Sequence, residues 1–298
     1  MILLSGGTGF IGSELLKRLL SEGRELACIV RAESNYARVE DIKKHITWIY
    51  NDEESIKAFF ENYDVEGVVH CATSYGRDTN DFFPVIEANL FLPITLLKYA
   101  NQYNCQYFIN TDSFFVNELG GAFKAGQTVY LDTYTKTKFV VRELLKANVG
   151  HLQTKIINME LQHVYGNNDS EGKFLNFFKE KLLSGVEYIE LTDGTQVRDW
   201  IYVDDVIHAY ITVINHIESF CTFEWNEVEV GTGIGTSLKE VCIKMKRASG
   251  AKTELLFGRK EKHKNELEES VANPKRLFEL GWTPEVDLDE GIRRILCE

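Results

Sequence analysis

MILLSGGTGFIG, residues 1–12, places three glycines three residues apart directly after a short apolar run. The apolar run is typical of a buried strand, and the residues from about Ile11 to Glu22 have the pattern of an amphipathic helix. A strand, a glycine-rich turn and a helix in this order are the context in which such a motif binds a dinucleotide. The turn lets backbone amides approach a pyrophosphate. The residues predicted to bind this cofactor are Gly6, Thr8, Gly9, Phe10, Ile11 and Gly12.

Short apolar strands and amphipathic helices alternate over the first 160 residues. Strands are predicted at 2–5, 25–31, 46–50, 67–72, 106–111 and 154–159, and helices at 11–22, 53–62, 83–103 and 132–147. This alternation predicts an α/β protein with a Rossmann-like, doubly wound parallel sheet that helices cover on both faces.

The alternation loosens after about Tyr165. Helices are predicted near 171–184, 205–217, 237–249 and 287–296, and strands near 188–191, 196–206, 227–231 and 254–257. We therefore expect a cofactor-binding domain over 1–160, to which segments of about 196–230 return, and a smaller C-terminal α/β substrate lobe over 161–298. Ligands of such folds bind at the carboxyl ends of the strands.

The formal net charge of −12 argues against nucleic acid or an anionic membrane as the main partner. The six cysteines include no C-x-x-C pair. Cys28, Cys71 and Cys105 fall within or beside predicted strands, so we expect buried free thiols there and a cytoplasmic protein. Met1 leads straight into the first predicted strand, so we expect no signal peptide. No apolar stretch is as long as a membrane span, and we predict no metal site.

Arg31 stands at the end of the second predicted strand, where an acidic residue would favour NAD. A guanidinium suits the 2′-phosphate of NADP instead, and Ser34 and Arg38 follow closely. The alternative is a solvated surface arginine. We expect NADP(H) as the cofactor.

Tyr134 and Lys138 form a Y-x-x-x-K pair on a predicted helix, where positions i and i+4 share one face. The ammonium would sit beside the phenol and lower the phenol pKa. Tyr134 could then exchange a proton with a substrate oxygen near neutral pH. The preceding strand supplies two hydroxyls, Thr111 and Ser113, able to bind the same oxygen.

The chain resembles an extended short-chain dehydrogenase/reductase of the NAD-dependent epimerase/dehydratase family. The matching motifs are GGTGFIG (6–12), VVHCATSYGR (68–77), EANLFLPITLL (87–97), FINTDSFF (108–115), YTKTK (134–138), LQHVYG (161–166), VRDWIYVDDV (197–206) and EVGTG (229–233). Within the family it is most similar to the branch that makes CDP-paratose and CDP-abequose, which reduces a CDP-4-keto-3,6-dideoxyhexose with NADPH.

The resemblance implies a role for each matching residue. Tyr134 would be the general acid and Lys138 its partner, while the triad hydroxyl stays open between Thr111 and Ser113. Ala72 would line the adenosine side of the cofactor. His163 replaces a family asparagine near the nicotinamide and the sugar phosphate. Asn89 matches a family asparagine that is structural or functional.

The resemblance also implies a substrate site for a nucleotide-diphosphate sugar. Arg198 matches the arginine that grips the diphosphate, the alternative being a salt bridge with a neighbouring aspartate. Lys173 and Lys262 are further candidate cations, the alternative being solvated surface positions. Tyr75 and Arg77 follow the fourth strand, where loops reach the sugar.

Several reactions share this scaffold, and the sequence favours reduction. Thr111-Asp112-Ser113 lacks the glutamate of the dehydratase Thr-Asp-Glu run, and Arg31 is unexpected in an NAD-retaining 4-epimerase. An epimerase-reductase would need a further acid/base pair, for which only His163 or Cys105 offers itself. A non-catalytic cofactor sensor would commonly lack Tyr134 and Lys138.

We expect NADPH-dependent reduction of the C4 ketone of a nucleotide-activated 4-keto-6-deoxy or 3,6-dideoxy hexose. CDP is the favoured nucleotide and dTDP the next. The product would serve deoxysugar synthesis for a bacterial surface polysaccharide such as the O-antigen of lipopolysaccharide. A homodimer is expected through the helices near 83–103 and 132–147.

Overall fold

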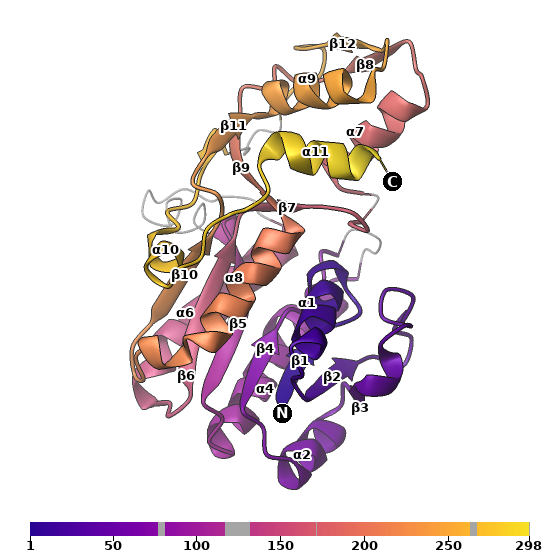
Figure 1. Cartoon of the computed structure of the whole chain (residues 1–298). Helices are drawn as coiled ribbons and strands as arrows, with labels where there is room; N and C mark the ends of the chain where they lie inside the picture. The colour runs from indigo at the N-terminus through magenta and orange to yellow at the C-terminus, as the bar shows by residue number, and fades with distance from the viewer. Residues whose placement is uncertain (77–80, 117–131, 171, 263–266, 298) are drawn as a thin grey trace. The chain divides into compact units, whose positions relative to one another are not determined.

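A sheet of seven strands, ordered β10-β6-β5-β4-β1-β2-β3, carries the first of two compact units, Met1–Glu160 with Tyr210–Val228 (Figure 1). The computed structural model describes residues 1–76, 81–116, 132–170, 172–262 and 267–297. The strands of this sheet are β1 (Ile2–Ser5), β2 (Leu26–Val30), β3 (Thr47–Tyr50), β4 (Gly67–His70), β5 (Tyr107–Ser113), β6 (Lys155–Leu161) and β10 (Asn226–Val230). The five strands from β5 to β3 pair in parallel, as the alternation predicts.

Helices cover both faces of this sheet. They are α1 (Phe10–Ser21), α2 (Glu53–Asn62), α3 (Phe83–Ile86), α4 (Leu92–Gln102), α6 (Thr133–Asn148) and, from Tyr210 onward, α8 (Val203–Asn215). Short turns are η1 (Lys43–His45), η3 (Val149–His151) and η4 (Ile217–Ser219). Ile56 of α2, Leu96 of α4 and Leu145 of α6 pack in one core with Val68 and Phe108 of the sheet. The helices α1 and α8 lie on the opposite face (Figure 1).

The helix predicted over 83–103 is interrupted. A π-helical turn, η2 (Glu87–Phe91), separates α3 from α4. Pro93 has no N–H to donate to the carbonyl of Asn89 four residues earlier, which disfavours regular α-helical bonding there. Turns of this kind gather at functional sites, and this one contains buried Asn89.

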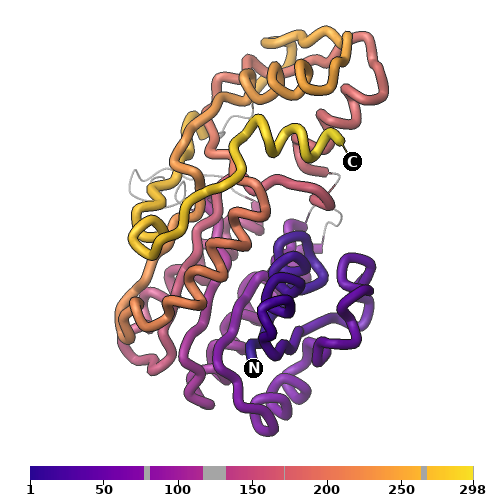
Figure 2. Tube along the Cα trace, in the orientation of Figure 1, coloured from indigo at the N-terminus to yellow at the C-terminus, as the bar shows by residue number. Residues whose placement is uncertain are grey.

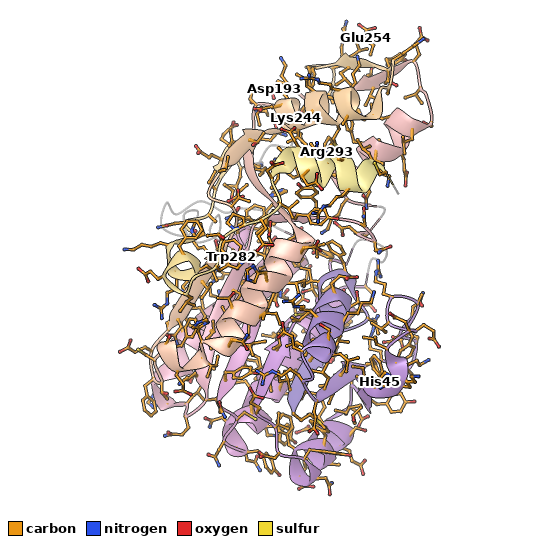
Figure 3. All side chains as sticks on the ribbon, viewed as in Figure 1. His45, Asp193, Lys244, Glu254, Trp282 and Arg293 are labelled. Atoms are coloured by element: carbon orange, nitrogen blue, oxygen red, sulfur yellow. The ribbon has the colours of Figure 1, made fainter. Side chains whose placement is uncertain are left out.

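The second unit comprises Leu161–Ala209 and Glu229–Glu298. Its strands are β7 (His163–Tyr165), β8 (Tyr188–Glu190), β9 (Val197–Tyr202), β11 (Gly235–Ser237), β12 (Glu254–Leu256) and β13 (Glu269–Ser270). Its helices are α7 (Phe174–Leu183), α9 (Leu238–Ser249), α10 (Lys275–Glu279) and α11 (Leu288–Leu296). Trp282 is fully buried and donates from Nε1 to the carbonyl of Asp205 at 3.1 Å (Figure 3).

The segment that returns to the first unit is shorter than predicted. It is 210–228 rather than about 196–230, because β9 pairs with β7, β11 and β13 of the second unit. Strands of two or three residues such as β11 and β13 are too short for a periodic pattern, so the sequence did not indicate them.

The chain path brings distant segments together at one edge of the sheet. Because β1 lies between β2 and β4 in parallel, the loops that follow β1, β4 and β5 leave from the same edge (Figure 2). Among the described residues, no helix has the length and apolar character to cross a bilayer. In that same part of the chain, no group of three or more His, Cys, Asp or Glu side chains could hold a metal ion.

Candidate active site

The glycine turn is so tight that Gly6 and Gly12 leave no room for a side chain. Gly6 has a φ of +77°, and a Cβ there would lie 2.5 Å from the backbone nitrogen of Ala72. A Cβ on Gly12 would lie 2.2 Å from the carbonyl oxygen of Gly6. Gly9 occupies the N-cap position of α1 and has no side chain to cover the helix amides. The turn therefore fits a pyrophosphate at the positive end of α1.

The other predicted cofactor residues lie around this turn. Thr8, Phe10 and Ile11 are half-buried. Ala72, directly against Gly6, donates its N–H to Ser5 Oγ at 3.4 Å. Ser5 Oγ also bonds Nδ1 of buried His70 at 2.8 Å.

Arg31 follows β2, as predicted, and is largely exposed. Its Nε lies 3.5 Å from a carboxylate oxygen of Glu33, and its backbone N–H donates to Ser34 Oγ at 2.9 Å. The sequence pattern did not predict this contact with Glu33. An exposed pair of this kind is weak, so a phosphate dianion can compete with Glu33 for the guanidinium.

The helix α6 presents the predicted catalytic pair. Asp132 caps the helix by accepting the N–H of Thr135 at 2.8 Å. Tyr134 and Lys138 are both buried, and Lys138 Nζ donates to the carbonyl of Thr111 at 2.7 Å. The side chain of Ser113 interacts with the phenol of Tyr134 and lowers its pKa.

The electrostatics of Tyr134 differ from the prediction. Burial raises the pKa of its phenol, and neighbouring Tyr75 and Asp112 act in the same direction, while the bond to Ser113 lowers it. The expected lowering of this pKa by Lys138 is not found. The ammonium is directed to the Thr111 carbonyl instead, and burial lowers its own pKa.

The two candidate hydroxyls point to different partners. β5 continues to Ser113, two residues beyond its predicted end, so Thr111 and Ser113 lie on the same face of this strand. Thr111 Oγ1 bonds the hydroxyl of Tyr210 on α8 at 2.5 Å, whereas Ser113 reaches Tyr134. The geometry favours Ser113 over Thr111 as the partner of the tyrosine.

Asn89 fastens the loop after β4 to α6. Its Oδ1 accepts the N–H of Ser74 at 2.9 Å, and its Nδ2 donates to the Ser74 carbonyl and to Thr137 Oγ1. Tyr75, next along this loop, is 42% exposed and packs its ring 4.7 Å from that of Tyr134. Arg77 lies outside the described residues.

In the second unit, Arg198 and His163 lie on neighbouring strands. Arg198 is buried and donates to the carbonyls of Val197 at 2.8 Å and Leu267 at 2.6 Å. The carboxylate of Asp199 binds Thr232 and Gly233. Burial, with the cations Arg198 and Lys173, lowers the pKa of His163 to about 3, so its ring is neutral at neutral pH.

The two candidate lysines have acidic neighbours. Lys173 pairs with Asp169 at 3.0 Å. Lys262 pairs with Asp193 at 3.3 Å and donates to Thr195 at 2.6 Å. Their positive charge is therefore already partly compensated.

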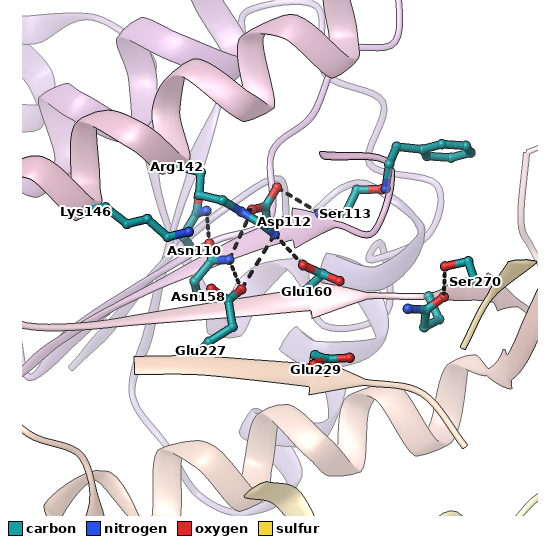
Figure 4. Close-up of polar contacts among 12 residues, drawn as sticks. Asn110, Asp112, Ser113, Arg142, Lys146, Asn158, Glu160, Glu227, Glu229 and Ser270 are labelled. Carbon is teal, nitrogen blue, oxygen red and sulfur yellow. Dashed lines mark hydrogen bonds and ion pairs between the residues drawn. The ribbon is translucent and has the colours of Figure 1, made fainter. Parts of the chain in front are cut away.

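A buried polar network beneath Ser113 escaped the sequence analysis (Figure 4). Arg142 bonds Asp112 and Glu160 and lies near Glu227, while Asn158 joins Asp112 to Glu227. The sequence contained one sign of this network. Arg142 lies four residues after Lys138, on the helix face that Tyr134 and Lys138 share.

Known proteins are similar to this chain over almost its whole length. The model of the NAD-dependent epimerase/dehydratase family matches residues 2–226. A CDP-abequose synthase of Salmonella typhimurium is 32% identical over 99% of this chain and 97% of its own length. A putative UDP-glucose 4-epimerase of Methanocaldococcus jannaschii is 26% identical over 99% and 97%.

Solved structures show the same fold. A Thermus thermophilus UDP-glucose 4-epimerase in complex with NAD has a TM-score of 0.77 and 25% identity, covering 99% of this chain and 97% of that one. A Stenotrophomonas maltophila UDP-glucose 4-epimerase with bound NAD has a TM-score of 0.83 at 19% identity, covering 99% and 96%.

Proposed function

We propose that this chain, which belongs to the NAD-dependent epimerase/dehydratase family, reduces the C4 ketone of a nucleotide-activated 4-keto-6-deoxy or 3,6-dideoxy hexose with NADPH. It is an NAD(P)-dependent enzyme of nucleotide-sugar metabolism. The observation that carries the proposal is that Tyr134 and Lys138 are both buried one turn apart on α6, with Lys138 Nζ bonded to the carbonyl of Thr111 on β5 at 2.7 Å. The 32% identical CDP-abequose synthase supports it over almost the full chain.

The residues of the first unit fit the cofactor. The cradle of Gly6, Gly9 and Gly12 would hold the pyrophosphate, Ala72 would line the adenosine side, and Arg31 would bind the 2′-phosphate. When bound, NADPH supplies a hydride to the ketone carbon.

Tyr134 would protonate the substrate oxygen while Ser113 hydrogen-bonds it. The raised pKa keeps the phenol protonated at neutral pH, and an alkoxide is basic enough to take that proton. Lys138 places positive charge one turn away from the phenol, where negative charge appears in the transition state. Stabilising the developing alkoxide more than the ketone is what accelerates the reaction.

The alternatives of dehydration and combined epimerisation find less support. Asp112 Oδ2 accepts from Arg142 and Asn158, and Oδ1 accepts the Ser113 N–H, so this carboxylate serves as an acceptor rather than a proton donor. Cys105 precedes β5 at the end opposite Ser113, and the strand from Tyr107 to Ser113 alone spans about 20 Å. Because its pKa is lowered to about 3, the ring of His163 is not protonated at neutral pH and is a weak base, which suits neither role of an acid/base pair.

The proposal for the nucleotide and the sugar of the substrate is based on the names of the relatives. We favour CDP, then dTDP, as the nucleotide, and a role in deoxysugar synthesis for a surface polysaccharide. Arg198 of the second unit is the proposed diphosphate ligand, with Lys173, Lys262 and Tyr75 as further substrate contacts. His163 is proposed near the nicotinamide and the sugar phosphate.

We also propose a homodimer through the long helices. Large apolar side chains are exposed on α3, η2 and α4 and on α6, namely Phe83, Phe91, Ile94, Val140 and Leu144. A run of exposed apolar side chains along helices of one unit is typical of a protein–protein contact.

Tyr134→Phe tests the proposal. We expect turnover of a CDP-4-keto-3,6-dideoxyhexose, followed by NADPH absorbance, to fall by about 10²- to 10⁴-fold, because the proton donor is lost. NADPH affinity should stay near that of the unaltered enzyme. Tyr50→Phe, on an exposed tyrosine, is the control. Full activity of Tyr134→Phe would refute the assignment, and an inactive unaltered enzyme that binds NADPH would favour a cofactor sensor.

A further inference from the structure

Arg142 lies one helical turn beyond Lys138 on α6, on the same stripe as Tyr134. All three side chains are buried, and each contacts a different residue of β5. Tyr134 bonds Ser113, Lys138 Nζ donates to the Thr111 carbonyl, and Arg142 Nε donates to Asp112 Oδ2 at 2.5 Å. The helix is thus fastened along the end of the catalytic strand.

Asp112 connects Arg142 to the backbone of Ser113 (Figure 4). Its Oδ2 accepts from Arg142 and from Asn158 Nδ2, the latter at 3.0 Å. Its Oδ1 accepts the N–H of Ser113 at 2.8 Å. The peptide group that carries the Ser113 side chain is therefore held by a carboxylate that the guanidinium itself holds.

The guanidinium is the cation of a crowded acidic cluster. Its second nitrogen bonds Glu160 at 2.6 Å and lies 3.6 Å from Glu227, to which Asn158 also donates. Burial raises the pKa of Glu160, although Arg142 opposes that shift. Arg142 bonds Asp112 from Nε and Glu160 from Nη2, and the compact ammonium of a lysine does not reproduce these separated donors of a planar fork.

We propose that Arg142 is a positioning residue for the reaction proposed above, on which this inference rests: through Asp112 it fixes the Ser113 backbone, and with it the hydroxyl that bonds Tyr134. Arg142 does not touch the reacting atoms itself. Its effect on turnover must therefore pass through Ser113.

Arg142→Lys is the first test, because it keeps the charge and removes the fork. We expect kcat to fall by about 10- to 100-fold, as small misplacements of catalytic groups do, with KM for the keto sugar within about twofold. On a Ser113→Ala background, Arg142→Lys should lower kcat by less than about threefold, since the route through Ser113 is already lost. Glu143→Gln, at the exposed neighbouring position, should leave kcat unchanged.

An unchanged kcat in Arg142→Lys would overturn the proposal. So would an equal loss of kcat in the presence and absence of Ser113→Ala, because a merely structural arginine would act independently of Ser113. Should Arg142→Lys fail to fold, Asp112→Asn takes its place, since it removes a negative charge and leaves Arg142 paired with Glu160. An asparagine has a single side-chain oxygen and an amide nitrogen that only donates, so at least one of the bonds from Arg142, Asn158 or Ser113 must break. The same kcat loss and the same coupling to Ser113→Ala are expected.

A crystal structure of either variant separates this proposal from the proposed function. We expect the hydrogen bond between Ser113 and Tyr134 to be present in the unaltered protein and lost in the variant. A retained bond would refute the positioning role. An unaltered enzyme without activity on keto sugars would refute the function, and the crystal structures would still decide on Arg142.

Discussion

Tyr134 is suited by its surroundings to giving a proton rather than taking one. Burial, Tyr75 and Asp112 hold its phenol pKa above the ordinary value, so the proton is present throughout the neutral range. Reduction of a ketone consumes a proton, and a protonated phenol is the form that this direction needs. The bond from Ser113 moderates the shift, so losing Ser113 should weaken the acid as well as misplace it.

The prediction that the cofactor is NADPH rather than NADH rests on one side chain, Arg31. In Arg31→Asp we expect the ratio of kcat/KM for NADPH to that for NADH to fall by at least about tenfold. A carboxylate repels the 2′-phosphate and accepts bonds from the ribose of NADH. The measurement is steady-state kinetics with both cofactors on the same keto sugar.

Glu33→Gln is the matched control for Arg31. It removes the carboxylate 3.5 Å from the guanidinium and should raise the NADPH preference a few-fold. Opposite shifts in the two variants would tie the selectivity to the charge on Arg31. Unchanged preference in both would mean that Arg31 does not read the 2′-phosphate.

The catalytic strand and helix show where sequence reasoning reaches its limit. The glycine turn and the Tyr134–Lys138 spacing are local patterns, and both were predicted correctly as parts of a strand–turn–helix and a helix face. The choice between Thr111 and Ser113 depended on where β5 ends and which side chain of another element each hydroxyl reaches, since both residues take the same face of the strand. The cluster around Arg142 joins β5, β6 and β10, whose residues are far apart in the sequence. Local periodicity holds no information on such pairings.

The π-helical turn η2 yields a prediction at the scale of an element. Asn89→Leu leaves the Ser74 N–H and carbonyl without their partner and should cost about 2 kcal/mol of the free energy of unfolding. The loop that carries Tyr75 loses its anchor, so KM for the keto sugar should rise more than kcat falls. Denaturant unfolding and steady-state kinetics measure the two effects.

Glu87→Gln, an exposed position of the same turn, is the control for Asn89 and should change neither quantity. Normal stability together with a normal KM in Asn89→Leu would show that the loop after β4 does not depend on this side chain.

At the scale of the whole molecule, the division into units follows from strand pairing. β9 belongs to the second unit because its neighbours β7, β11 and β13 are there, although five of its six residues are buried, as in most strands of the first sheet. Composition alone could not assign 196–209 to either unit, since both need buried strands. Pairing partners, which lie up to about seventy residues away, decide the assignment.

The proposed dimer is tested by its exposed apolar side chains. Phe91 and Val140 are 54% and 42% exposed, on η2 and α6 of the first unit. We expect the mass of the unaltered protein, measured by sedimentation, to be about twice the 34.2 kDa of one chain. The Phe91→Glu/Val140→Glu double variant should sediment as a monomer, because burying two carboxylates without partners opposes association.

Phe177→Glu controls for the change from an exposed aromatic to an acid. Phe177 is 40% exposed on α7. This helix belongs to the second unit, whereas the helices proposed to form the contact belong to the first. This variant should remain a dimer in sedimentation-velocity runs across the same concentration range. A monomeric unaltered protein would refute the dimer, and dissociation by Phe177→Glu alone would move the contact to the second unit.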